Sequence, residues 1–151
     1  MSYDLMVFDP KAAPTTRAGF MDWYRQQTKW SEDHHYDDPA VSTPELRAWF
    51  LDIIPHYPMM NGPYASEDDS SKVTDYSIGR SVIYAGFAWS EAAPARELTF
   101  RLAQQHRIGF FDVSVGNGGV WIPTADGPYT CIHGQGAQQP DRKWWEFWKR
   151  P

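Results

Sequence analysis

The sequence lacks the features of a secreted or membrane-spanning protein. It has a single cysteine, Cys131, so no internal disulfide can form, and this content fits a reducing cytosol. No stretch approaches the roughly 18 consecutive apolar residues that a membrane span requires. The N-terminus also lacks the basic start and long apolar run of a secretory signal. We therefore expect a cytoplasmic protein without a membrane span.

Basic residues are also few. The chain has 14 Lys and Arg against 19 Asp and Glu, a net charge of −5. Binding to phosphates needs a basic surface, so nucleic acid is not an expected partner. Ten acidic and two basic residues fall between positions 31 and 75, which gives this segment −8 and leaves the remainder at +3. Such a surface attracts a basic partner, although acidic loops can also simply keep a Trp-rich protein soluble.

Sequence motifs of catalysis are missing as well. There is no GxSxG, P-loop, Rossmann, CxxC or HExxH pattern, and "GNGG" at 116–119 is typical of a hairpin turn. Cys131 and His133 are two positions apart, but a Cys–His pair needs contact in space, which this spacing neither shows nor excludes. We predict no catalytic residue and no cofactor, and we favour a non-enzymatic protein over an enzyme.

The chain does contain enough apolar residues for a sizeable core, because 42% of it is hydrophobic and 16% is aromatic. Local patterns predict the order β-α-α-β-β-α-β-β, with a hairpin that turns at Gly79 and Arg80. The expected elements are a strand at 3–8, helices at 16–30, 43–54 and 90–106, a hairpin at 73–89, and strands at 107–115 and 120–123. This order indicates an α+β fold, a ferredoxin-like antiparallel sheet with helices on one face.

We expect one domain over residues 1–123, followed by a turn-rich tail at 124–151 with a Trp-rich end. The end of the tail, "KWWEFWKRP", would be an aggregation hazard if its rings stayed in water. We expect it to dock on its own domain or on a second chain, so that a homo-oligomer could form through Trp144, Trp145 and Trp148. The alternative is a partner or membrane interface, which suits Trp beside Lys and Arg.

The segment "SEDHHYDDP", residues 31–39, contains four acids and two adjacent histidines; we call it the first acidic loop. We favour an ordinary polar loop, then a partner-binding surface, then a metal or catalytic site. The metal alternative would use His34, His35 and Asp37. Neighbouring histidines in an extended loop point apart, which weakens this alternative.

The segment at 56–72, the second acidic loop, contains "MMNGPY" and a further run of acids. Methionine and tyrosine are common at protein-binding surfaces, although these side chains could also fold back onto the core. We predict that the two loops form a surface for a basic protein partner. Its expected residues are Glu32, Asp33, Asp37, Asp38, Met59, Met60, Tyr64, Asp68 and Asp69.

Several segments together resemble a family of small, largely uncharacterised bacterial proteins. They are "MSYDLMVFDP", "FMDWY", "SEDHHYDDP", "TPELRAWF", "MNGPY" and "DYSIGRSVIYAGFAWS" with "GFFDVS". The resemblance covers roughly the first 123 residues and brings no catalytic motif with it. Small acidic α+β proteins of this kind are similar to immunity proteins that neutralise bacterial toxins. The resemblance therefore implies a toxin domain as the basic partner.

Overall fold

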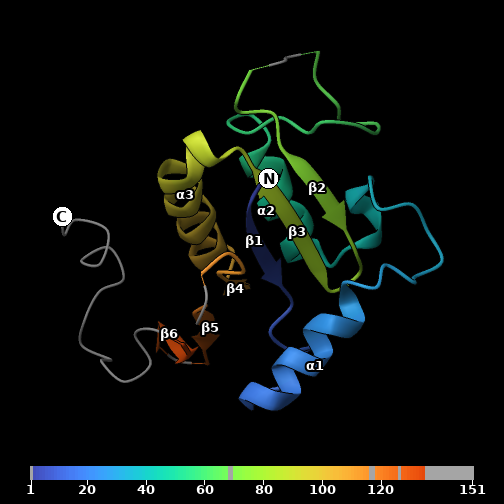
Figure 1. The fold of residues 1–151 in the computed structure, drawn as a ribbon. Coiled ribbons are helices and arrows are strands. Elements are labelled where there is room, and N and C mark those ends of the chain that lie inside the picture. The colour runs from blue at the N-terminus through green and yellow to red at the C-terminus, as the bar shows by residue number, and fades with distance from the viewer. Residues whose placement is uncertain (1, 68–69, 116–117, 126, 135–151) are drawn as a thin grey trace.

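The computed structural model describes residues 2–67, 70–115, 118–125 and 127–134. This part of the chain forms a six-stranded antiparallel sheet with three α-helices (Figure 1). The elements are β1 (Tyr3–Phe8), α1 (Arg17–Gln27), α2 (Pro44–Ile53), β2 (Asp75–Ile78), β3 (Val82–Phe87), α3 (Ala92–Gln105), β4 (Gly109–Phe111), β5 (Val120–Thr124) and β6 (Gly127–His133). The α+β class and the antiparallel sheet are confirmed.

Helices cover both faces of the sheet. As a result, both sets of alternating side chains on β1 are buried, apart from Asp4. Leu5 and Val7 pack in one core cluster with residues of α2 and α3. Met6 and Phe8 pack on the other face with Phe20 of α1. The prediction that all helices lie on one face is therefore wrong. The continuous apolar run of β1 is what a strand buried on both faces requires.

The strands lie in the order β2-β3-β1-β4-β5-β6, so β2 and β6 are the edge strands. This six-strand order differs from the four-strand order of the ferredoxin-like sheet that we expected. The structure supports the broader α+β description and does not confirm the ferredoxin-like topology.

The sheet also continues beyond residue 123, where we expected a turn-rich tail. β6 pairs with β5, and its residue Tyr129 is almost fully buried. The Tyr129 ring lies 5.2 Å from the Phe100 ring, and its hydroxyl donates to the Ile108 carbonyl at 2.7 Å. Tyr129 is far from Phe100 and Ile108 in the sequence, so the contacts that stabilise this strand cannot be recognised from the local pattern. That pattern is rich in Gly and Pro and indicates turns instead. The Trp-rich end at 144–148 lies outside the described residues.

Hydroxyl side chains cap the first two helices: the sequence offers Thr15 or Thr16 before α1 and Ser42 or Thr43 before α2, and the structure uses Thr16 and Thr43. Thr16 Oγ1 accepts from Gly19 N at 3.1 Å before α1, and Thr43 Oγ1 accepts from Leu46 N at 3.3 Å before α2. The neighbouring Ser42 is buried and donates instead to the Gly79 carbonyl at 2.6 Å. This hydrogen bond ties the start of α2 to the β2–β3 turn, which occurs where the sequence predicts it.

Candidate functional site

The two acidic loops flank β2, an edge strand of the sheet. The Tyr36 carbonyl of the first acidic loop accepts from Ile78 N at 2.9 Å. Met60 N of the second acidic loop donates to the Thr74 carbonyl at 3.0 Å, just before β2 begins. Both loops therefore use the backbone groups that an edge strand leaves free, one near each end of the strand.

The loops also touch each other. Gly62 of the second loop packs so closely on Asp37 of the first that an added β-carbon would lie 2.6 Å from the Asp37 Cβ. Gly62 has φ of +85°, a backbone conformation that glycine adopts without steric cost. Asp37, His35 and Asn61 line a hollow of about 400 Å³ along the outer edge of β2. The two acidic loops thus form one continuous surface.

Glu32 and His34 hold the first acidic loop in place. Glu32 Oε1 lies 2.5 Å from His34 Nε2 and accepts from Arg80 N, in the β2–β3 turn, at 3.0 Å. The other ring nitrogen of His34 bonds to the His35 carbonyl at 2.8 Å. This last contact is the main reason why the pKa of His34 is raised, and Glu32 adds to the effect while burial opposes it.

The alternative metal site is not assembled. Both ring nitrogens of His34 contact protein oxygens, and the described residues contain no group of three His, Cys, Asp or Glu side chains that could hold a metal ion. His35 and Asp37 instead face the hollow beside β2.

The residues predicted to bind a partner divide into surface and structural groups. Asp33 is exposed, and the side chains of Met60 and Tyr64 are 52% and 42% exposed. Asp38 caps the short 3₁₀ turn that follows, since its Oδ1 accepts from Ala40 N at 2.9 Å.

Two residues of the predicted partner-binding surface, Met59 and Glu32, have structural roles. Met59 is fully buried in the core cluster beneath α2, so it offers no contact surface. Glu32 is largely occupied by its contacts within the first loop and to the turn. Asp68 and Asp69 lie outside the described residues.

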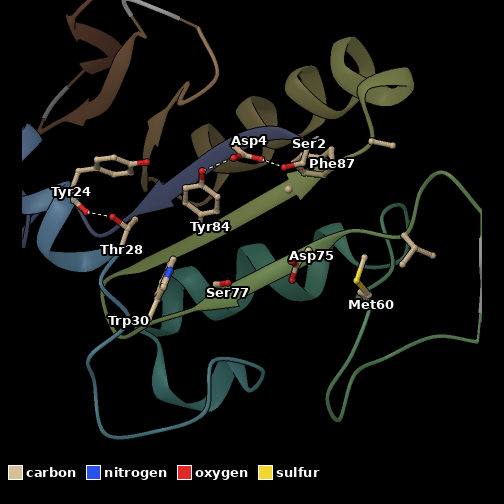
Figure 2. Close-up of a pocket in the computed structure, with 13 residues that line it drawn as sticks. Ser2, Asp4, Tyr24, Thr28, Trp30, Met60, Asp75, Ser77, Tyr84 and Phe87 are labelled. Atoms are coloured by element: carbon tan, nitrogen blue, oxygen red, sulfur yellow. Dashed lines mark hydrogen bonds between the residues drawn. The ribbon is translucent and has the colours of Figure 1, made fainter.

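A larger groove lies on the face of the sheet that carries α1, where that helix stops short of β2 and β3. Its volume is about 610 Å³. Figure 2 shows Trp30 and Met60 at its two ends, with Asp4, Tyr84, Asp75 and Ser77 between them. The groove and the second acidic loop share Met60, so the groove adjoins the acidic surface.

Asp4 is held by two hydroxyl groups in this groove. Tyr84 donates to its Oδ2 at 2.6 Å and Ser2 donates to its Oδ1 at 2.5 Å (Figure 2). Burial, followed by the hydrogen bond to Asp4, raises the pKa of Tyr84, and burial also raises the pKa of Tyr24 beside it. These phenols stay protonated at neutral pH, so Tyr84 remains a donor to the carboxylate.

This groove is not visible in the sequence, because its residues come from five separate segments, 2–4, 24–30, 60, 73–77 and 84–88. Asp4 lies within an apolar strand pattern, and Trp30 is the last residue of the first predicted helix. In the structure Tyr84 and Gly86, which share one face of β3, are half-buried, whereas Ile83, Ala85 and Phe87 on the other face are buried.

Cys131 and His133 do not form a nucleophilic pair. The Cys131 Sγ donates to the backbone carbonyl of His133 at 3.1 Å, not to its ring. Burial raises the pKa of the Cys131 thiol to about 11, so the thiolate is scarce at neutral pH. Burial also lowers the pKa of His133, which packs beside Phe20 of α1.

Comparison with known proteins finds no match to a family model, to a curated protein or to a solved structure. Among the described residues, no helix has both the length and the apolar character needed to cross a membrane.

Proposed function

We propose that the protein is a non-enzymatic protein-binding module whose two acidic loops form the contact surface for a basic protein. The observation that carries this proposal is the contact of Asp37 with Gly62, which joins the loops beside β2. The segment that contains both loops has a net charge of −8. A negative surface of this kind speeds association with a basic partner and disfavours acidic ones.

Apolar side chains at the same place support binding rather than solubility alone. Met60 and Tyr64 are exposed on the second acidic loop, although most large apolar side chains of the described residues are buried. Tyr64 packs edge-on against Phe50 of α2 at 5.8 Å, so its ring is held in position before a partner arrives. Pre-positioned aromatic rings within a charged rim are typical of the strongest contacts in protein interfaces.

A finer form of the proposal is that this module is a cytoplasmic immunity protein and that its partner is a basic toxin domain. Its support is the small size, the acidity and the resemblance to such proteins described above. The ferredoxin-like topology also remains a proposal; the run β2-β3-β1-β4 favours it, whereas α1, β5 and β6 lie outside that scheme. Assembly of copies through Trp144, Trp145 and Trp148 is a separate proposal.

An enzyme or small-ligand protein is the alternative function. The observation that favours it is the groove of about 610 Å³, which is large enough for a small molecule. No described residue of the first acidic loop, which we had considered for this role, lines the groove; Trp30 lies immediately before that loop.

Charge reversal on the acidic loops tests the proposed function. The double variant Asp33→Lys, Glu67→Lys places one change on each loop, at exposed side chains. The matched control, Asp22→Lys with Glu97→Lys, makes the same change in net charge at exposed positions on α1 and α3. We expect the loop variant to bind the purified partner at least about tenfold more weakly, and the control to bind normally.

The partner for this measurement is captured from lysate of the producing cells, purified and titrated by calorimetry at two salt concentrations. Weaker binding at high salt supports an electrostatic contact. Equal loss in both variants, or the absence of any partner at moderate salt, contradicts the proposal. For the immunity form, expression of the partner alone should arrest growth, and co-expression of the wild-type chain should restore it more fully than the loop variant does.

A further inference from the structure

Three neighbouring strands place two carboxylates on either side of a glycine. Asp4 of β1 pairs with Gly86 of β3, and Gly86 pairs with Asp75 of β2. Residues that are directly opposite in an antiparallel sheet project from the same face. Asp4 and Asp75 therefore project from the same face across two strand spacings, a separation of about 10 Å between their backbones.

Gly86 leaves the floor between these carboxylates open. An added β-carbon would lie 3.3 Å from Ser2 Oγ and 3.4 Å from Asp4 Oδ1, so even a methyl group would press on the side chains around Asp4. A glycine inside a strand lacks a side chain to pack and often marks a close approach by a ligand. We call this space the Gly86 hollow; it is part of the groove shown in Figure 2.

The described residues that line the groove carry charge of one sign only. Asp4 and Asp75 are both among them, and none of them is Lys, Arg or His. Asp4 is also fixed in place by Ser2 and Tyr84, so its carboxylate needs little reorganisation to meet a ligand. A cation that enters the groove replaces a repulsive pair of carboxylates with two attractive contacts.

Aromatic rings face the same space. Trp30 lies 6.1 Å from the Tyr84 ring and 5.2 Å from the Tyr36 ring, nearly perpendicular to each. Trp30 also has φ of +52°, a left-handed backbone conformation that is rare for a bulky residue. Strained residues of this kind cluster at ligand sites, and an indole face attracts cations.

We propose that the Gly86 hollow binds an organic cation, an ammonium or guanidinium group at the end of an aliphatic chain. The cationic group lies between Asp4 and Asp75 and beside the Tyr84 ring, against which Trp30 packs at the end of the groove. The aliphatic chain runs along the groove toward Met60 and Val73, at the end that adjoins the second acidic loop. Where the cation is a lysine or arginine of a protein partner, the inference rests on the proposed function.

Titration with small cations tests the site directly. The probes are agmatine as a free amine, and N-acetyl-arginine methylamide and N-acetyl-lysine methylamide as stand-ins for a protein side chain. The neutral citrulline analogue is the control ligand. We expect saturable binding of the cations and none of the neutral N-acetyl-citrulline methylamide, with shifts of the Gly86 amide and Trp30 indole signals in two-dimensional NMR spectra only for the cations.

Two variants locate the binding in the hollow. Asp75→Asn keeps the shape of an exposed side chain and should weaken binding about fivefold, as expected for loss of one exposed charge contact. Gly86→Ala fills the floor and should weaken it more. Glu97→Gln on α3 removes the same charge elsewhere and should bind as the wild type does. Denaturant unfolding of each variant verifies that the fold is retained.

The outcomes separate this inference from the proposed function. No saturable binding of any cation, or binding that is unchanged in Asp75→Asn and Gly86→Ala, overturns the inference. If charge reversal on the acidic loops still weakens binding of the purified partner in that case, the proposed function is supported without this inference. Tighter binding of agmatine than of the capped amino acids assigns the site to a free amine, and the reverse assigns it to a side chain of the partner.

Discussion

Glu32 and His34 contribute to the fold more directly than to any surface. Glu32 joins the His34 ring to the backbone of the β2–β3 turn, and the ring lies 4.7 Å from Tyr36. Their residue types suggested metal or partner binding, because a sequence shows which donors are present but not which groups already satisfy them. Asp37 and Asp33 are the carboxylates of this loop that remain at the surface for a partner.

The raised pKa of His34 leads to a prediction about pH. The folded pKa lies above the ordinary value of 6.5, so protonated His34 stabilises the fold fully below that pH. This contribution is lost as the pH rises through the folded pKa. We expect His34→Gln to lose more stability relative to wild type at about pH 6 than at about pH 8.

Urea unfolding midpoints at the two pH values measure this difference. His35→Gln is the control, because it changes the same residue type at an adjacent, exposed position. A loss of stability in His34→Gln that does not depend on pH would show that the ring acts through packing on Tyr36 alone.

At the scale of elements, a buried ion pair joins α3 to the segment after β4. Arg96 Nε donates to Asp112 Oδ2 at 2.7 Å, and both side chains are more than nine-tenths buried. Tyr3 of β1 donates to the other carboxylate oxygen at 3.2 Å. The Arg96 guanidinium also lies 5.4 Å from the centre of the Phe110 ring. The Asp112 carboxylate thus links α3 and β1 to the segment after β4 within the core.

Breaking this pair should be strongly destabilising. Asp112→Asn keeps the size of the side chain but leaves the Arg96 charge buried without its counter-ion. We expect a loss of about 3–5 kcal/mol in the free energy of unfolding, measured by urea denaturation.

The exposed pair of Asp22 and Arg25 on α1 provides the contrast, since both side chains are more than 60% exposed. We expect Asp22→Asn to change stability by less than about 1 kcal/mol. If the two substitutions had similar effects, water would reach the Arg96–Asp112 pair in solution, and the pair would not be effectively buried.

For the molecule as a whole, β1 connects two cores. Its side chains alternate between the cluster under α2 and α3 and the cluster under α1. Phe20 is the fully buried residue of α1, and its ring lies within 6 Å of both Phe8 and Phe111. Because one strand belongs to both clusters, loss of either core should weaken the other.

This arrangement predicts cooperative unfolding. Phe20→Ala leaves a cavity beside β1 and should lower the free energy of unfolding by about 3–5 kcal/mol. We expect far-UV and near-UV circular dichroism to report one coincident transition in both the wild type and the variant. Separate transitions would show that α1 and its cluster form an independent unit.

Local patterns determined much of this structure. The i, i+3, i+4, i+7, i+8 spacing of Leu46, Trp49, Phe50, Ile53 and Ile54 predicts the buried face of α2. The first four side chains are fully buried, and Ile54 is half-buried against the same cluster. The β2–β3 turn was also predicted correctly, and the cap at Thr16 is one of the two positions, Thr15 and Thr16, that the sequence offers. These features depend on residues within one or two helical turns or one hairpin of each other, where sequence spacing fixes which side chains share a face.

Only the tertiary structure decided where the functional surfaces lie. The Asp4–Tyr84 hydrogen bond joins residues 80 positions apart, and the row from Asp4 through Gly86 to Asp75 depends on the register of three strands. The contact between Asp37 and Gly62 depends on how two loops cross the edge of β2. The sequence carries the charge and the residue types, whereas packing between distant segments sets which of them meet.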